Sequence, residues 1–339
     1  MGAEKVVNVY RNGRLESSHM GHIAVVNAKG ELLYEVGDVN RRTYARSSVK
    51  PIQAIPLVET GAADFFNYSE ADLSIACASH SGEEQHTSRV ADILQRSGIN
   101  EDRLQCGPHI PHSQDTYKQL IANGGELTSV HSNCSGKHTG MLVTAKYMDE
   151  PLEDYHEAGH PVQQRIKEVL SDLTEYPEAD IGVGIDGCGV PVFELPLERL
   201  ALGFARLADP SGLSEGRRDA IERVTSAMMK YPEMVGGTGR FCTDFMKVAD
   251  GRLFGKAGAE SVYCIGDRET GIGIAIKVED GSGRAMYPVA LEVLKQLGLL
   301  SGSQLVELED HYKPKIKNTR QEKVGEIVAS FKLKSASPL

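Results

Sequence analysis

The chain has 339 residues, a net charge of −10, 40% apolar residues and 25% charged residues. These proportions are typical of a globular protein that can bury a core, and they exclude disorder, collagen-like repeats and coiled coils. The negative charge disfavours attraction to phosphate backbones and anionic lipid. We therefore expect neither a nucleic-acid partner nor a membrane partner.

The six cysteines are widely spaced and form no Cys-x-x-Cys pair. Small disulfide scaffolds need a denser pattern, so we expect reduced thiols. The first residues lead directly into a strand-like segment, without the apolar stretch and cleavage site of a signal peptide. These features predict a cytoplasmic location.

The first forty residues have the pattern of antiparallel strands. Val6–Tyr10, Ile23–Val26 and Leu32–Val36 are rich in β-branched and aromatic residues, and the first two flank the turn signal Asn12-Gly13. Near the other end, Val324–Leu333 has a similar composition. We expect this late strand to close the same sheet as the first ones.

The middle of the chain is mainly helical in pattern, and further strands and helices follow it. Helices are predicted at Pro51–Glu59, Ser69–Cys77, Gln85–Ser97, Lys137–Met148, Pro161–Leu173, Glu215–Lys230, Ala285–Leu299 and Gln304–Glu309. Strands are predicted at Arg252–Lys256, Ser261–Ile265 and Gly271–Val278, and the basic run Lys313–Lys317 is interpreted as a solvated connector.

These elements predict an α/β fold with an antiparallel sheet flanked by helices. No repeat or linker divides the chain, so we expect residues 1–339 to form a single catalytic unit. Its subdomains would be interleaved, with the sheet formed by residues from about 1–45 and 250–335 and a mainly helical region over 46–249.

The segment Gly182–Gly187 fits the G-x-G-x-x-G pattern of dinucleotide-binding proteins. That chemistry requires a long helix opening after the glycines. Here Pro191 and Pro196 bracket a segment with extended character, so the glycines are better explained by a tight loop.

The segment Arg46–Pro51 contains a Ser-x-x-Lys spacing between Ser47 and Lys50. In a helical first turn this spacing puts a hydroxyl and an amine within hydrogen-bonding reach. A lysine removed from water and close to other cations has a lowered pKa, so its neutral amine could accept the serine proton. A helix N-cap followed by a surface lysine gives the same spacing. Because Pro51 disfavours the helical conformation at Lys50, we expect the helix to begin after the lysine.

Further segments combine small residues with chemically active side chains. Gly255–Glu260 carries a second lysine at a strand end, Cys77–Glu83 joins hydroxyls and an imidazole on a turn, and Asn133–Gly140 leads into a helix. Asp186–Gly189 encloses a thiol between glycines. Taken singly, these patterns also suit ordinary turns and packed cysteines.

Together and in this order, five motifs resemble the rhizobial-type (class 3) L-asparaginases of the asparaginase II family. The motifs are Arg-Ser-x-x-Lys-Pro at 46–51, Cys-x-Ser-His-x-Gly at 77–82, Asn-Cys-Ser-Gly-Lys-His at 133–138, Asp-Gly-Cys-Gly at 186–189 and Gly-Lys-x-Gly-Ala-Glu at 255–260. The resemblance implies a fold related to serine β-lactamases and glutaminases. It also implies hydrolysis of L-asparagine to L-aspartate and ammonia by a homodimer.

The resemblance implies roles for eleven residues. Two Ser-Lys pairs would be formed, Ser47 with Lys50 and Ser79 with Lys256. Zinc would be bound by Cys134, Lys137 and Cys188, and the substrate site would be lined by Arg46, His80, His138 and Asp186. Thiolates are ordinary zinc ligands, whereas lysine coordinates only as a neutral amine, so His138 is an alternative third ligand.

Two other classes of protein share part of this pattern. β-Lactam-recognising and D-alanyl peptidase-like enzymes share Ser-x-x-Lys and Lys-x-Gly, but they normally carry a secretion signal, and the cysteine and histidine motifs have no role in their chemistry. A zinc-binding regulatory module descended from an enzyme would not need Ser47, Lys50, Ser79 and Lys256 intact. We therefore expect an asparagine amidohydrolase that forms an acyl-enzyme on Ser47.

Overall fold

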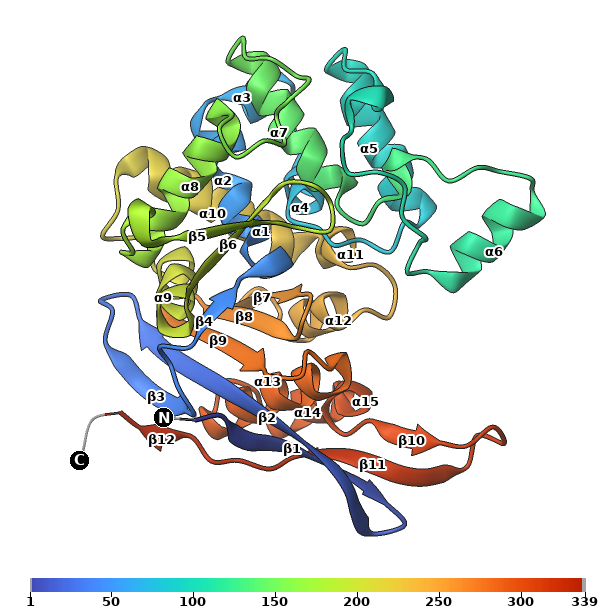
Figure 1. The fold of residues 1–339 in the computed structure, drawn as a ribbon, viewed down its shortest axis with the longest axis vertical. Helices are drawn as coiled ribbons and strands as arrows, with labels where there is room; N and C mark the ends of the chain where they lie inside the picture. Colours follow the sequence, from blue (N-terminus) through green and yellow to red (C-terminus); the bar gives the residue numbers. More distant parts are fainter. Residues whose placement is uncertain (1, 337–339) are drawn as a thin grey trace. The chain divides into compact units, whose positions relative to one another are not determined.

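The structure is a computed structural model that describes residues 2–336, and the chain divides into two compact units (Figure 1). Unit 1 comprises Met1–Ser48, Glu194–Asp209 and Val248–Leu339, and unit 2 comprises Val49–Phe193 and Pro210–Lys247. The chain thus leaves unit 1 and returns to it twice. No helix formed by the described residues is long and apolar enough to cross a membrane.

Unit 1 is built on one large antiparallel sheet. The strand order is β10-β11-β1-β2-β9-β8-β7, with β3 beside β2 and β12 beside β3. The strands are β1 (Glu4–Arg11), β2 (Arg14–Asn27), β3 (Leu32–Val36), β7 (Leu253–Gly258), β8 (Val262–Asp267), β9 (Ile272–Val278), β10 (Lys315–Lys317), β11 (Lys323–Ala329) and β12 (Lys334–Ser335). This arrangement confirms the predicted antiparallel sheet flanked by helices.

The two ends of the chain meet in this sheet, as predicted from their composition. β1 pairs antiparallel with β11, with Val7 opposite Ala329, and Figure 1 shows the blue β1 beside the red β11. The interpretation of Lys313–Lys317 as a connector was wrong, because Lys315–Lys317 forms the edge strand β10 against β11. Its two lysines are exposed, and charged side chains of this kind protect a sheet edge from further pairing.

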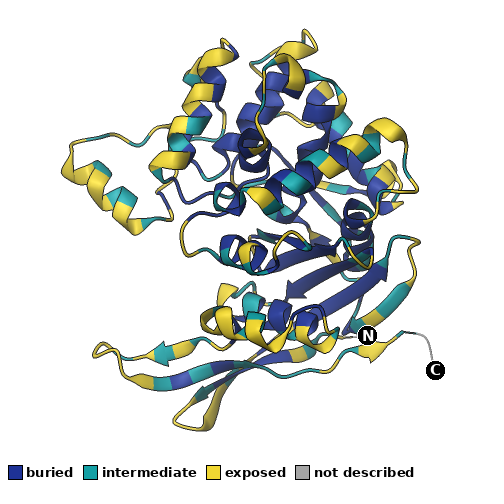
Figure 2. Cartoon of the chain, turned by 180° about the vertical axis from the view of Figure 1, so that it is seen from behind, coloured by how far each residue is buried: buried dark blue, intermediate teal, exposed yellow. Residues whose placement is uncertain are grey.

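Helices cover both faces of the sheet. On one face, Gly273 of β9 lies against the backbone of Ala201 and Ala205 in α9 (Leu197–Ala208), a helix that sequence patterns did not predict. Side chains alternate between faces along a strand, and on the other face Tyr263 of β8 packs edge-on against Tyr287 of α13 (Gly283–Gln296). In Figure 2 the central strands are dark blue, so the core of unit 1 lies between these helices and the sheet.

The remaining elements of unit 1 are short. They are β4 (Arg42–Tyr44), which pairs with the end of β6 (Pro191–Pro196), the 3₁₀ helix η1 (Arg46–Val49), α14 (Gly302–Glu307) and α15 (Glu309–Tyr312).

Unit 2 is mainly helical. Its α-helices are α1 (Lys50–Gln53), α2 (Ile55–Glu59), α3 (Ala62–Phe65), α4 (Glu70–Ala76), α5 (Glu84–Arg96), α6 (Gln114–Ala122), α7 (Ser135–Tyr147), α8 (Pro161–Thr174), α10 (Glu215–Lys230), α11 (Pro232–Val235) and α12 (Phe241–Val248). Shorter elements are η2 (Glu101–Arg103), η3 (Ser129–His131), η4 (Glu178–Asp180) and β5 (Gly182–Ile185).

The glycine-rich segment that imitates a dinucleotide motif forms strand β5 and a tight turn. The Asp186 N–H donates to Val190 O (2.9 Å), and the Gly189 N–H donates to Asp186 O (2.9 Å). The extended strand β6 follows the turn, so no helix opens behind the glycines.

The core of unit 2 is centred on α7. Every residue from Ser135 to Ala145 is buried, because other helices surround α7 on all sides. At its first turn, Gly136 lies so close to the Ile75 carbonyl of α4 that a side chain at this position would collide with the backbone. This contact places the start of α7 beside the turn that follows α4.

Candidate active site

The turn after α4 carries Ser79 and is fixed by hydrogen bonds on both sides. Helix α4 begins with a capping box between Ser69 and Asp72 and ends at Ala76. The bonds that hold the following turn are Ser79 N–H to Val235 O (3.0 Å), His80 N–H to Asn133 O (3.1 Å) and Ser81 O–H to Gly236 O (3.0 Å). Ser79 is thus held in place by neighbours far away in the sequence.

Lys50 is fully buried and its amine reaches this turn. Contrary to the expected start after the lysine, α1 begins at Lys50, and Pro51 occupies the second helical position, where a missing N–H costs nothing. Lys50 Nζ lies 3.1 Å from Ser79 Oγ and 3.1 Å from Cys134 Sγ, and it also donates to Ala78 O. These three acceptors match the three donors of an ammonium group.

Two thiols and two amines form a buried cluster beside Ser79. Lys137 Nζ lies 3.1 Å from Cys188 Sγ, and the Cys188 thiol is hydrogen-bonded to the Cys134 sulfur. This bond, together with Lys50 and Lys137, holds the pKa of Cys134 well below its usual value. The same bond and burial raise the pKa of Cys188, so Cys134 is the more acidic thiol of the pair.

The pKa of Lys137 reflects the same cluster. Burial alone would lower it, but the sulfurs of Cys188 and Cys134 raise it above the ordinary lysine value. Lys137 therefore pairs as an ammonium with the sulfur atoms when no metal is bound.

The two histidines predicted to line the substrate site are fully buried. His80 Nε2 lies 2.8 Å from Ser135 Oγ, and His80 Nδ1 accepts from the Gly82 N–H (3.1 Å), so both ring nitrogens have protein partners. His138 Nδ1 lies 2.6 Å from the Tyr155 hydroxyl. Burial lowers the pKa of both rings, and nearby cations lower it further, so both are neutral at pH 7.

Asp186 occupies the half-buried turn between β5 and β6. Its carboxylate is close enough to Lys137 to contribute to the raised pKa of that amine. Unit 2 therefore brings together Lys50, Ser79, Cys134, Lys137, Cys188 and Asp186, with His80 and His138 packed behind them.

The other three predicted residues belong to unit 1, where two segments converge. Gly258 at the end of β7 lies against the turn before η1, since a Cβ there would be 2.9 Å from Ala45 O and 3.3 Å from Arg46 Cβ. The same strand carries Lys256, which is buried and donates to Ala257 O (2.6 Å). Arg46 has a left-handed backbone (φ 51°), and Ser47 follows it half-buried.

The adjacent serine in η1 has a structural role. Ser48 is fully buried and donates its hydroxyl proton to Ala45 O (2.6 Å). Its oxygen is also hydrogen-bonded to the buried Cys264 thiol, whose pKa burial raises to about 12. Of the two neighbouring serines, Ser47 is thus the more accessible.

Sequence reasoning gave no role to two side chains of this region, Asn133, which begins the motif at 133–138, and His112. Asn133 Oδ1 lies 3.1 Å from Cys134 Sγ, and Asn133 Nδ2 lies 3.2 Å from His112 Nε2. Burial and nearby Arg240 lower the pKa of His112 to about 4. For His112 the only signal was the His109-x-x-His112 spacing, which in a loop does not define where the side chains point.

The buried cluster supplies two free thiols and an amine at the place where zinc was expected. Residues 2–336 contain no group of three or more His, Cys, Asp or Glu side chains suited to a metal, so two thiols would need an amine or imidazole as a third ligand. Lys137 Nζ already contacts Cys188, and buried His138 Nε2 has no hydrogen-bond partner among the described atoms. Lys137 was the predicted third ligand and His138 the alternative, and each has a nitrogen that could complete the ligand set.

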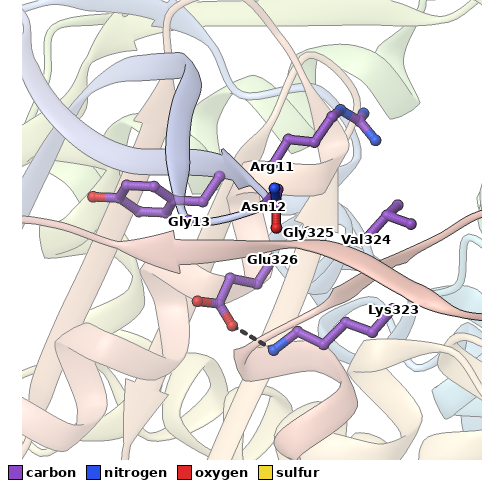
Figure 3. Close-up of a pocket in the computed structure, with 8 residues that line it drawn as sticks. Arg11, Asn12, Gly13, Lys323, Val324, Gly325 and Glu326 are labelled. Carbon is purple, nitrogen blue, oxygen red and sulfur yellow. Dashed lines mark hydrogen bonds and ion pairs between the residues drawn. The ribbon is translucent and has the colours of Figure 1, made fainter.

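A separate hollow of about 530 Å³ lies at the end of the β1–β2 hairpin in unit 1 (Figure 3). It is lined by Tyr10–Gly13 and Lys323–Glu326, and none of the eleven predicted residues takes part. Its Lys323 and Glu326 side chains form an ion pair with each other (2.7 Å). This hollow lacks a nucleophile with a neighbouring base.

Comparison with known proteins identifies the class and then the family. A buried lysine in contact with a serine hydroxyl is an arrangement that also occurs in hydrolases in which a serine is the nucleophile. The L-asparaginase II family model matches residues 7–329, so the chain belongs to that family, whose members act on amides. No curated protein matches the chain.

Solved structures show a distant likeness. A β-lactamase from Mycobacterium bovis is 12% identical, with a TM-score of 0.44 over 81% of this chain and 94% of that chain. A putative β-lactamase from Bacteroides dorei is 13% identical, with a TM-score of 0.42 over 81% and 93%. Mglu, in its native form in 4.3 M NaCl, is 15% identical, with a TM-score of 0.46 over 84% of this chain and 63% of that chain.

Proposed function

We propose that this protein hydrolyses L-asparagine to L-aspartate and ammonia through a serine ester. Membership of the L-asparaginase II family supports the substrate. The observation that carries the mechanism is the buried Lys50 amine 3.1 Å from Ser79 Oγ, because a desolvated amine in contact with a hydroxyl can exchange a proton with it.

The reaction proceeds in two balanced steps. A serine oxygen attacks the side-chain amide carbon of asparagine, the carbon–nitrogen bond breaks, and ammonia leaves with the proton that the serine gave up. A water molecule then adds to the aspartyl ester and releases aspartate, and its proton returns to the serine oxygen. Lys50 is the group that takes up and returns the proton during these steps.

We assign the nucleophile to Ser47 and the proton relay to Ser79, with Lys256 as the second amine. The hydroxyl of Ser79 contacts Lys50, and the accessible Ser47 lies three residues before that lysine. Rapid quenching and peptide mass spectrometry test the assignment. The aspartyl group is expected on the peptide that contains Ser47 and not in Ser47→Ala, whereas an ester on Ser79 would reverse the two roles.

Zinc held by Cys134, Cys188 and Lys137 would supply a positive charge that orients the carboxylate or amino group of the substrate. The thiols fit this role because thiolates are ordinary zinc ligands, and the Cys188 hydrogen bond together with the two amines beside the thiols lowers the pKa of Cys134. The two buried histidines support this cluster from behind. His80 is hydrogen-bonded to Ser135 and Gly82, and His138 is hydrogen-bonded to Tyr155, so both rings hold the start of α7 in position.

Two assays run in parallel test the function. One measures ammonia release from L-asparagine and from L-glutamine, and the other measures opening of a β-lactam. We expect release from L-asparagine, and a preference over L-glutamine of at least about 100-fold, because one extra methylene displaces the amide from the nucleophile. Opening of the β-lactam without ammonia release from L-asparagine would instead assign the protein to the β-lactam-recognising enzymes.

The family resemblance also supports a cytoplasmic homodimer. Light scattering of the purified chain should give twice the mass of one chain, and fractionated cells should contain the protein in the cytoplasmic fraction.

A further inference from the structure

Arg240 lies at the end of a glycine-rich loop that is pressed onto the Ser79 turn. The loop runs from Gly236 to Arg240, between α11 and α12. Gly237 has a φ of 117°, and a Cβ there would be 2.7 Å from Ser81 Oγ, so only glycine allows this approach. Arg240 Nη1 consequently lies 3.5 Å from Ser81 Oγ, two residues from Ser79.

The guanidinium of Arg240 has no anionic partner in the described part of the chain. No carboxylate of residues 2–336 lies within 4.0 Å of it, and its hydrogen bond is to the neutral Ser81 hydroxyl. Among the described residues, six of the seven other arginines of unit 2 form ion pairs, the exception being Arg218, and the six are Arg89, Arg96, Arg103, Arg165, Arg217 and Arg223. A half-buried guanidinium without a counter-ion loses hydration without gaining an ion pair, so an anionic ligand would be stabilised there.

A short chain of contacts runs from Lys50 to His112, a ring that is within electrostatic reach of Arg240. Cys134 Sγ contacts both Lys50 Nζ and Asn133 Oδ1, and Asn133 Nδ2 contacts His112 Nε2. Besides burial, the positive charges of Arg240 and Lys50 lower the pKa of His112. The Ser79–Ser81 turn is therefore flanked by an amine that reaches Ser79 and a guanidinium that reaches Ser81.

We propose that Arg240 binds the α-carboxylate of the amino-acid amide substrate, with Ser81 beside it, and so selects amides that carry this group. This assignment rests on the proposed function. A guanidinium recognises a carboxylate through two parallel hydrogen bonds. Binding at this point would anchor one end of the substrate while its amide faces the Lys50 and Ser79 side of the turn.

The experiment compares two substrates that differ only in the α-carboxylate, L-asparagine and 3-aminopropanamide. Wild type, Arg240→Gln, Arg240→Lys and the control Arg223→Gln are assayed for ammonia release. Arg223 pairs with Asp64 on another part of unit 2, so its loss tests the effect of removing an arginine as such. Melting temperatures show which variants fold.

For L-asparagine, Arg240→Gln is expected to lower kcat/KM by about 10- to 100-fold, mainly through KM, because a charge-assisted hydrogen bond is lost. For 3-aminopropanamide, Arg240→Gln should have the same kcat/KM as wild type. For L-asparagine, Arg240→Lys should recover part of the kcat/KM that Arg240→Gln loses. Equal losses for both substrates, or no loss for L-asparagine, would overturn the assignment.

Calorimetric binding of L-aspartate separates this proposal from the proposed function. If wild type releases no ammonia from any amide, the proposed function fails, yet weaker L-aspartate binding by Arg240→Gln would still support the carboxylate site. Equal binding by wild type and Arg240→Gln, or no binding by wild type, would contradict it.

Discussion

Gly136, in the first turn of α7, lies against the carbonyl oxygen of Ile75 near the end of α4. This contact between two backbones brings Cys134, at the N-cap of α7, and Lys137, in its first turn, beside the turn that carries Ser79. A change at Gly136 should therefore affect both the stability of unit 2 and the candidate active site.

Gly136→Ala should lower the free energy of unfolding by about 1–3 kcal/mol, because the new methyl group overpacks the helix contact. Gly140→Ala on the same helix is the matched control. Its Cβ would meet Leu57 Cδ2 at 3.4 Å and Ala76 Cβ at 3.6 Å, which are ordinary contacts. Urea unfolding measures both variants, and equal stabilities for them would contradict the close packing at Gly136.

Zinc content should depend on the two thiols of the buried cluster. Protein purified without chelator is expected to contain about one zinc ion per chain, and Cys134→Ser or Cys188→Ser should lose most of it, since each removes one of few ligands. Cys242→Ser is the control, because this buried cysteine lies outside the cluster. Elemental analysis measures the zinc content of each variant. A Cys134→Ser protein that still contains about one zinc ion per chain would show that the metal is held elsewhere.

The stability of unit 1 should depend on Glu279 in a defined pH range. Hydrogen bonding to Arg41, and then to His22, lowers the pKa of Glu279 from 4.5 to about 2. A carboxylate with a lowered pKa stabilises the folded state above its unfolded pKa, and this contribution disappears as the pH falls through the folded value. Because the side chains of Arg41 and Glu279 are each about a third exposed, we expect their ion pair to contribute about 1 kcal/mol or less to the free energy of unfolding.

Glu279→Gln should thus be less stable than wild type at pH 7, and the difference should shrink between pH 4.5 and pH 2. Glu322→Gln serves as the control, because its exposed carboxylate pairs with Arg320 on a hairpin. Urea unfolding at several pH values measures the difference. A constant difference across this range would mean that the ion pair with Arg41 contributes nothing.

The alternating and β-branched segments were sufficient to predict the sheet. Val6–Tyr10 and the late strand have few polar interruptions, so their pairing across the whole chain could be inferred, and the structure confirms it. Helix α9 was missed although its alanines and leucines have high helix propensity, because it follows directly on the extended segment between Pro191 and Pro196. Short irregular segments such as β10 depend on a partner strand, which local sequence does not specify.

The sequence was enough to predict which residues form the candidate site, but not which of their side chains contact one another. The motifs around Lys50, Ser79 and Cys134 are local, whereas the 3.1 Å distance between Lys50 Nζ and Cys134 Sγ joins residues 84 positions apart and depends on the packing of α4 and α7. Arg240 has no sequence signal, because its importance comes from the absence of a carboxylate nearby and from the glycine loop that positions it.

The most direct test of the account is ammonia release from L-asparagine by Lys50→Met. Methionine fills a similar volume but cannot move a proton, and such proton transfer typically supplies roughly 100-fold to 10,000-fold in rate. Lys146→Met is the matched control, because its exposed amine bonds only to the Gly98 carbonyl. The account predicts that Lys50→Met folds but loses at least about 100-fold in kcat, while Lys146→Met keeps its rate. A folded Lys50→Met enzyme within a few-fold of wild type would contradict it.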